Sequence, residues 1–119
     1  MRITMDAYNA NPTSMQASIK SFMQSASDET SLILGDMLEL GEYSTDEHIT
    51  ILELLKNYPK CNVYLVGNQF FEIAGEYKFT AFENVDSLCE TLKKTPITEG
   101  NVLIKGSRGI HLEKVLNCF

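Results

Sequence analysis

Short apolar runs alternate along this chain with segments in which apolar residues recur every three or four positions. The runs are typical of β-strands, and the three-to-four spacing is typical of helices. The expected strands are residues 2–8, 31–37, 62–67, 78–82 and 101–105. The run at residues 31–37 is nearly continuous in apolar residues, which is the pattern of a strand buried on both faces of a parallel sheet.

Helix-start signals accompany the segments between these strands. Asn11 followed by Pro12 predicts a helix that Asn11 caps and Pro12 begins. Ser44 and Glu47 form a capping-box signature for a second helix, and Asn84 is expected to cap a later one. The other two helices are expected at residues 69–76 and 112–119.

The alternation of strands and helices decides the fold class. Strands separated by helices pair in parallel through βαβ crossovers, and the helices cover both faces of the sheet. The chain has 119 residues and no internal repeat or linker. We therefore expect a single Rossmann-like α/β domain over residues 1–119, with a mostly parallel sheet of about five strands and flanking helices.

Composition narrows the class of protein. Apolar residues make up 44% of the chain and charged residues 22%, as in an ordinary globular protein. The net charge of −6 argues against a nucleic-acid partner, because such domains carry a basic face. No apolar run approaches the roughly 18 residues of a membrane helix, and the first residues have no signal-peptide pattern. A cytoplasmic protein without membrane insertion is expected.

The cysteines and histidines point to no metal site. Cys61, Cys89 and Cys118 are far apart and odd in number, so we expect buried free thiols. The two histidines, His48 and His111, have no spacing that would build a zinc site with them.

Polar residues follow the strands at the edge where an open parallel sheet binds ligands. Lys105, Ser107 and Arg108 follow the last strand, and two cations with a hydroxyl suit a phosphate or carboxylate. The alternative is a solvated loop with a partly covered lysine. Asp6 lies in a strand, where aspartate is disfavoured, which indicates a nearby partner or ligand. Asn9 has no capping role, whereas Asn11 could be only a cap.

Two acidic residues and a histidine follow the second strand. Asp36 and Glu39 are candidates for a role in the site. The alternative is that both are ordinary solvated loop residues. His48 lies in the first turns of a helix, where the dipole favours its neutral form. A surface or packing histidine is the alternative for His48.

Several catalytic motifs are missing from the sequence. It contains no G-x-x-x-x-G-K-[ST] phosphate loop, no G-x-G-x-x-G fingerprint and no nucleophile elbow. We therefore expect this chain to have no self-sufficient machinery for ATP chemistry or acyl transfer.

Three motifs together resemble one family. Residues 6–15 resemble the D-x-Y-N-A-N-P-x-S-M signature of the MurF ligases. Residues 35–41 resemble the G-D-M-x-E-L-G loop of that family, with His48 at the expected distance. Residues 105–108, followed by Glu113, resemble its K-G-S-R segment. The motifs occur in order and span most of the chain.

The resemblance implies a three-domain enzyme whose third domain matches this chain. MurF ligases join D-Ala-D-Ala to UDP-MurNAc-tripeptide in peptidoglycan biosynthesis, through an acyl phosphate formed with ATP. The resemblance implies that ATP and Mg2+ are held mainly by the central domain. It also implies that this domain closes over the nucleotide, with its own N-terminal and central domains as partners. We expect a monomeric enzyme and an isolated domain that is inactive and binds no metal itself.

The resemblance also assigns roles to matched positions. Asp6 would hydrogen-bond the ATP ribose, and Asn9 and Asn11 would lie near the phosphates. The residues implied to face the reaction centre or line the inter-domain cleft are Lys105, Ser107, Arg108, Asp36, Glu39 and His48. Family members have a further strand upstream of Asp6, so we expect a chain trimmed at the domain boundary and an exposed sheet edge.

Two other function classes remain open. One is a stand-alone nucleotide- or anion-binding module without catalysis. The other is a doubly wound signalling domain of receiver type, because Asp6, Asp36 and Lys105 loosely match its acidic cluster and lysine. The N-A-N-P motif has no place in such a signalling domain.

Overall fold

The structure is a computed structural model that describes residues 1–6, 10–25 and 29–119. Its strands are β1 (Arg2–Asp6), β2 (Thr30–Gly35), β3 (Asn62–Val66), β4 (Thr80–Phe82) and β5 (Asn101–Lys105). Its α-helices are α1 (Pro12–Ser25), α2 (Ser44–Leu55), α3 (Asn68–Ala74) and α4 (Val85–Lys94). Its 3₁₀ helices are η1 (Gly41–Tyr43), η2 (Gly75–Tyr77), η3 (Arg108–Ile110) and η4 (Leu112–Asn117).

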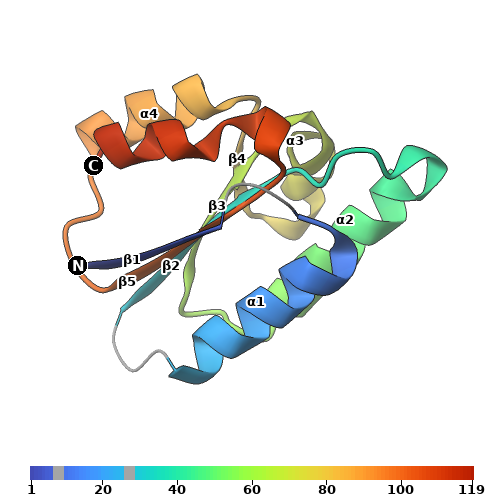
Figure 1. The fold of residues 1–119 in the computed structure, drawn as a ribbon, viewed down its shortest axis with the longest axis horizontal. Helices are drawn as coiled ribbons and strands as arrows, with labels where there is room; N and C mark the ends of the chain where they lie inside the picture. Colours follow the sequence, from blue (N-terminus) through green and yellow to red (C-terminus); the bar gives the residue numbers. More distant parts are fainter. Residues whose placement is uncertain (7–9, 26–28) are drawn as a thin grey trace.

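The five strands form one parallel sheet in the order β1-β5-β2-β3-β4, as Figure 1 shows. The last strand in sequence therefore lies between the first and second. In the register of the sheet, Asp6 is the partner of Lys105, and Lys105 is also the partner of Leu34. The carboxyl ends of β1, β5 and β2 are thus level with one another. The expected parallel α/β fold is confirmed.

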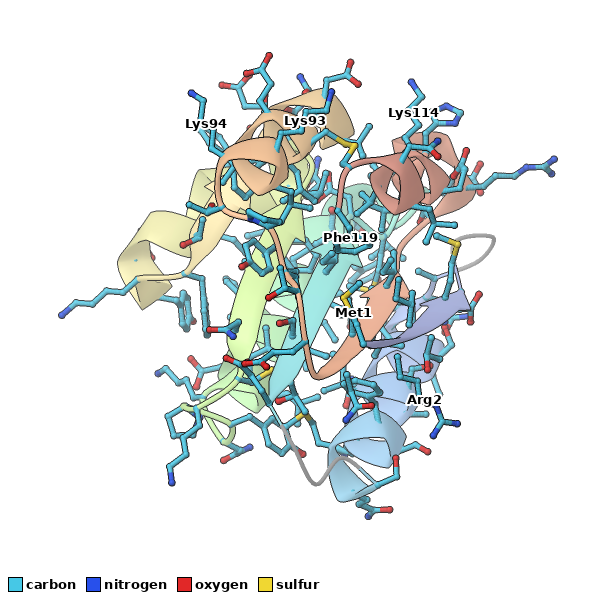
Figure 2. All side chains as sticks on the ribbon, turned by 90° about the vertical axis from the view of Figure 1, so that its left-hand side faces the viewer. Met1, Arg2, Lys93, Lys94, Lys114 and Phe119 are labelled. Atoms are coloured by element: carbon cyan, nitrogen blue, oxygen red, sulfur yellow. A yellow bond between two sulfur atoms is a disulfide. The ribbon has the colours of Figure 1, made fainter. Side chains whose placement is uncertain are left out.

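The helices cover both faces of the sheet (Figure 1). Residues of α1, α2 and α3 pack against Leu32 and Leu34 of β2 in one apolar cluster. Residues of α4 and η4 pack against Ile33 of β2 in a second cluster. Successive residues of a strand point to opposite faces, which is why three neighbouring apolar residues are all buried. On the outer side of α4 and η4, Figure 2 shows Lys93, Lys94 and Lys114 projecting away from the sheet.

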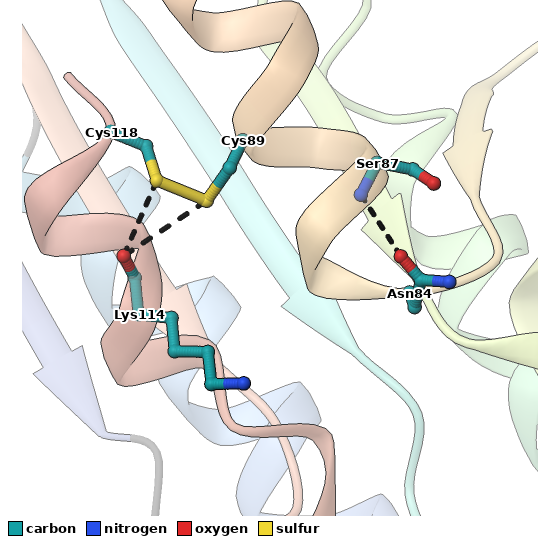
Figure 3. Close-up of a disulfide and its surroundings, with 5 residues drawn as sticks. All are labelled: Asn84, Ser87, Cys89, Lys114 and Cys118. Carbon is teal, nitrogen blue, oxygen red and sulfur yellow. Dashed lines mark hydrogen bonds between the residues drawn. A yellow bond between two sulfur atoms is a disulfide. The ribbon is translucent and has the colours of Figure 1, made fainter.

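Two expected helix features are corrected. The last helix is 3₁₀ rather than α, with Leu112 and Val115 buried against the sheet. The capping box of Ser44 and Glu47 does not form, because η1 runs directly into α2 with Tyr43 already in helical conformation. By contrast, Asn84 caps α4 as expected by accepting a hydrogen bond from the Ser87 N–H at 2.9 Å (Figure 3).

The expectation of three free thiols is wrong for two of them. Cys89 of α4 and Cys118 after η4 form a disulfide, with their Cα atoms 5.2 Å apart (Figure 3). Cys61 is the free thiol, and burial raises its pKa. The pairing was hidden in the sequence because 29 residues separate the two cysteines, and only the packing of η4 against α4 brings them together.

Strand β1 lies at one edge of the sheet, and alternate residues along it are exposed. Within the described ranges it pairs only with β5. No described helix is both long enough and apolar enough to cross a membrane.

Candidate functional site

The candidate site lies at the carboxyl ends of the strands. Because β5 lies between β1 and β2, the segments that follow these three strands become neighbours despite their distance in sequence. In parallel α/β sheets this edge is where ligands bind. The candidate residues on it fall into two groups, which differ in whether their side chains are buried inside the domain or exposed.

Lys105 belongs to the inward group. Its side chain is 1% exposed, and its ammonium nitrogen lies 2.6 Å from Oδ2 of Asp6. A buried ammonium is stable only when it is paired, and the partner here is also its neighbour in the sheet register. Asp6 keeps half of its side chain exposed. Lys105 therefore orients Asp6 from beneath instead of lying on the open surface.

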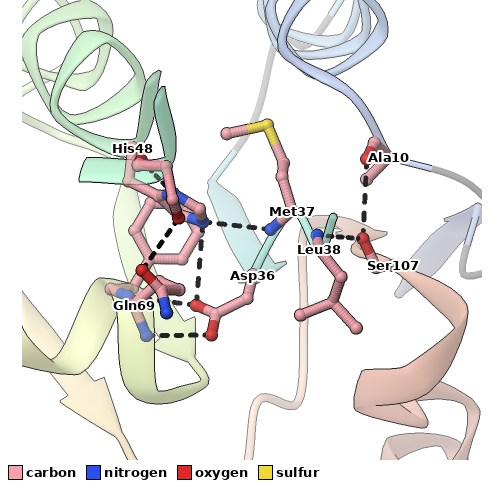
Figure 4. Close-up of polar contacts among 9 residues, drawn as sticks. Ala10, Asp36, Met37, Leu38, His48, Gln69 and Ser107 are labelled. Carbon is pink, nitrogen blue, oxygen red and sulfur yellow. Dashed lines mark hydrogen bonds and ion pairs between the residues drawn. The ribbon is translucent and has the colours of Figure 1, made fainter. Parts of the chain in front are cut away.

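Ser107 is a junction between three segments (Figure 4). Its hydroxyl accepts the Leu38 N–H at 2.9 Å and donates to the Ala10 carbonyl at 3.5 Å. Its own N–H donates to the Asp36 carbonyl at 3.1 Å. The side chain is buried, and these contacts join the loops that follow β5, β1 and β2.

Asp36 uses its carboxylate at the start of α3. Oδ2 accepts the Gln69 N–H at 2.9 Å and Oδ1 accepts the Phe70 N–H at 3.0 Å. A carboxylate is favourable there because the first N–H groups of a helix have no partner within it. Gly67 has a φ of 122°, and any Cβ at this position would collide with the Asp36 carboxylate. Asp36 is only 3% exposed, so it faces the interior and not the cleft.

Burial raises the pKa of the Asp36 carboxyl, although the N–H groups of Phe70 and Gln69 act in the opposite direction. The sequence contains one signal for this cap. Gly67 precedes α3 and has no side chain that could cap it. Such a helix start needs an acceptor from elsewhere in the fold.

His48 is completely buried in α2 (Figure 4). Its Nε2 accepts the Met37 N–H at 3.0 Å, and its Nδ1 lies 2.6 Å from the Ser44 carbonyl. Because a carbonyl can only accept, Nδ1 must carry the proton, and the ring is the neutral Nδ1–H form. Nε2 also lies 3.9 Å from Oδ1 of Asp36, but a neutral ring makes no ion pair there. The edge of the Phe70 ring completes the enclosure, with centroids 4.6 Å apart.

The outward group consists of Asp6, Asn11, Glu39 and Arg108. Glu39 is exposed and has a left-handed backbone with a φ of 65°. Arg108 is exposed at the start of η3; its carbonyl accepts the His111 N–H at 3.2 Å, and within the described ranges its guanidinium makes no hydrogen bond or ion pair. Asn11 caps α1 as expected, since its Oδ1 accepts the Ser14 N–H at 2.9 Å. Asn9 lies outside the described residues.

The outward group suits contacts with a polar ligand better than a metal centre. Its two carboxylates can accept hydrogen bonds from hydroxyl groups. Its guanidinium can bind an anion. Within residues 1–6, 10–25 and 29–119, no three His, Cys, Asp or Glu side chains come together as a metal site. These residues therefore do not form a cage for Mg2+.

Comparisons with known proteins agree with this geometry. The family described as Mur ligase, glutamate ligase domain, matches residues 1–108. The UDP-N-acetylmuramoyl-tripeptide–D-alanyl-D-alanine ligase of Rickettsia prowazekii is 31% identical over 122 residues, covering 99% of this chain and 27% of that protein. The enzyme of the same name from Treponema pallidum is 32% identical, over 93% of this chain and 26% of its own length. The chain thus spans about a quarter of these relatives.

Solved structures show the same correspondence. The MurF ligase of Thermotoga maritima in complex with ADP superposes with a TM-score of 0.70 at 25% identity, over 98% of this chain and 28% of that one. MurF from Acinetobacter baumannii superposes with a TM-score of 0.73 at 29% identity, over 97% of this chain and 27% of that one. The chain therefore belongs to the Mur ligase glutamate ligase domain family, in which it corresponds to the C-terminal domain of MurF.

Proposed function

We propose that this chain is the nucleotide-facing domain of a cytoplasmic, monomeric ligase that joins D-Ala-D-Ala to UDP-MurNAc-tripeptide at the expense of ATP. The names of the relatives and the ADP complex of a solved neighbour support this proposal. The observation that carries it is the meeting of three separate motifs at one edge of the sheet. Asp6, Glu39 and Arg108 are exposed at that edge, while the residues behind them are anchored.

In the proposed reaction, the tripeptide carboxylate attacks the γ-phosphorus of ATP, which forms an acyl phosphate and ADP. The amine of D-Ala-D-Ala then attacks the acyl carbon, and the resulting tetrahedral intermediate releases phosphate. Mg2+, held mainly by the central domain, would neutralise charge on the phosphates. The present domain contributes positioning and exclusion of water, which can supply several kcal/mol of the barrier.

Each exposed residue has a distinct proposed task. The Asp6 carboxylate, oriented by Lys105, accepts hydrogen bonds from the ribose hydroxyls. The Arg108 guanidinium binds a phosphate or carboxylate oxygen at the reaction centre. Asn11 contacts the phosphate end of the nucleotide, a task that the motif match also gives to Asn9, and Glu39 faces the cleft between domains. Lys105, Ser107, Asp36 and His48 act from behind this surface.

Steady-state ligation by the full-length protein that contains this chain tests the proposal. We expect Asp6→Ala to raise the KM for ATP by about ten- to a hundredfold, because a hydrogen bond to a charged group is worth about 1.5–3 kcal/mol. We expect Arg108→Ala to lower kcat/KM about a hundredfold, as loss of a stabilising donor does. Lys93→Ala, on the outer surface of α4, is the matched control and should leave both constants unchanged. A wild-type protein that forms no amide product would overturn the proposal.

A further inference from the structure

Three successive backbone amides after β2 are each fixed by a different part of the fold. The Asp36 N–H donates to the Val66 carbonyl of β3 at 2.9 Å. The Met37 N–H donates to His48 of α2 at 3.0 Å, and the Leu38 N–H donates to Ser107 beyond β5 at 2.9 Å. This anchoring ends at the next residue, which is the exposed Glu39.

Glu39 needs such anchoring because of its backbone. Its φ of 65° lies in the left-handed region, which residues other than glycine, asparagine and aspartate seldom adopt. A conformation of this kind persists only where the surrounding structure imposes it. The anchored amides of Met37 and Leu38 immediately precede this residue and supply such a constraint, and the Glu39 side chain is exposed.

His48 is the side chain in this arrangement that cannot touch a ligand. It has no exposed surface, and both of its ring nitrogens are hydrogen-bonded within the domain, Nε2 to the Met37 N–H and Nδ1 to the Ser44 carbonyl. Met37 is 1% exposed, so its N–H would have no water partner if the imidazole were removed. An unsatisfied buried N–H is costly, and the loop would move to relieve it.

We propose that His48 is a positioning residue of the ligase: by accepting the Met37 N–H it holds the loop that aims Glu39 at the substrate. This inference rests on the proposed function, and it differs from a direct contact between His48 and the dipeptide or phosphate. His48 acts through one acceptor atom, Nε2, in the neutral Nδ1–H form. Its second bond, to the Ser44 carbonyl, holds the ring in the orientation that points Nε2 at the loop.

A double-mutant cycle in the full-length protein tests the link to Glu39. We expect His48→Leu to lower kcat/KM for D-Ala-D-Ala about tenfold or more, the usual cost of losing a supporting residue behind a site. His48→Gln retains an acceptor and should recover most of the activity. If His48 acts through Glu39, then adding His48→Leu to Glu39→Ala should cost little more than Glu39→Ala alone. Additive losses, or full activity in Glu39→Ala, would overturn the proposal.

Hydrogen exchange provides a readout that does not depend on ligation. In the full-length protein, the peptide covering residues 35–40 should exchange faster in His48→Leu than in the wild type and His48→Gln, while β3 and β5 keep their protection. Unchanged exchange in the loop would refute the anchoring itself. Faster exchange in a protein without ligase activity would instead show that the anchoring is real and the proposed function is wrong. If His48→Leu does not fold, His48→Met takes its place, because its flexible side chain fills the space without a comparable acceptor, and unchanged exchange of residues 35–40 in that variant would refute the anchoring.

Discussion

Lys105 and Arg108 are both cations of one short segment, yet burial gives them different tasks. Lys105 is sealed beneath the surface and pairs with Asp6, whereas Arg108 is exposed. The sequence alone predicts the same behaviour for both, namely a larger effect of substitution on ligation than on stability. The structure keeps that expectation for Arg108 and changes it for Lys105.

We predict that Lys105→Ala destabilises the protein by about 2 kcal/mol and also weakens ATP binding. The cost is below the roughly 3–5 kcal/mol of a fully buried pair, because water can reach the half-exposed Asp6. Arg108→Ala should change the free energy of unfolding by less than about 0.5 kcal/mol. Urea denaturation of the two variants measures the difference, and equal stability would contradict the buried role of Lys105.

Asp36 makes the stability depend on pH in a defined direction. Its folded pKa is raised, mainly by burial, so in the window between its ordinary and folded pKa the native state binds more protons than the unfolded state. The free energy of unfolding contributed by this group therefore falls as pH rises through the folded pKa. Asp36→Asn removes this titration.

We predict that the difference in free energy of unfolding, wild type minus Asp36→Asn, decreases as the pH rises above the ordinary pKa of an aspartate. Denaturation of both proteins at a series of pH values provides the test. Other groups titrate in both proteins and cancel in the difference. A difference that grows with pH would show that the N–H groups of Gln69 and Phe70 outweigh burial.

At the scale of elements, the helix starts show which local signals are sufficient. Asn11 and Asn84 both cap the helices that the sequence assigns to them. Ser44 does not, because η1 extends the helix backwards and removes the free N–H groups that a cap would serve. The Ser44 hydroxyl instead donates to Oε1 of Gln69 at 2.8 Å, which ties α2 to α3.

The two caps provide a matched pair of variants. Asn11→Ala and Asn84→Ala should each lower the free energy of unfolding by about 1 kcal/mol, the usual cost of a lost side-chain cap. Only Asn11 lies at the proposed nucleotide edge, so only Asn11→Ala should also raise the KM for ATP. Thermal melting with ligation kinetics separates the effects, and an unaltered melting curve for either variant would count against its cap.

The disulfide joins the end of the 3₁₀ helix η4 to the α-helix α4. η4 is 3₁₀-helical, a form with poorer hydrogen-bond geometry than an α-helix, and Cys118 fastens its end to α4. We predict that Cys118→Ser lowers the free energy of unfolding by about 3 kcal/mol under oxidising conditions. The wild type in a thiol reductant should match this variant. If reductant leaves wild-type stability unchanged, the bond adds nothing to the fold.

At the scale of the whole molecule, the sheet order creates the candidate site. Placing β5 between β1 and β2 gathers three motifs that are dispersed along 119 residues. The candidate site is one-sided for the proposed reaction, because the sequence contains no phosphate loop that would hold a nucleotide.

We therefore predict that the 119-residue chain by itself hydrolyses no ATP and forms no amide product. Calorimetric titration with ATP should show weak or no binding. Tight binding of ATP without ligation would favour a stand-alone nucleotide-binding module over the ligase domain. Tripeptide-dependent ligation by this chain alone would contradict the view that it carries only part of an active site.

The sequence by itself determined the elements, two helix caps and the parallel α/β class, because these depend on the periodicity of near neighbours and on turn chemistry. Only the tertiary structure decided which candidate residues are buried and which are exposed at the carboxyl edge of the sheet. Lys105 pairs with a residue 99 positions away, and Ser107 accepts from an amide 69 positions away. Such pairings and their burial follow from strand order, which no local pattern contains. The same physics made His48 an anchor behind the site and left Glu39 and Arg108 at its surface.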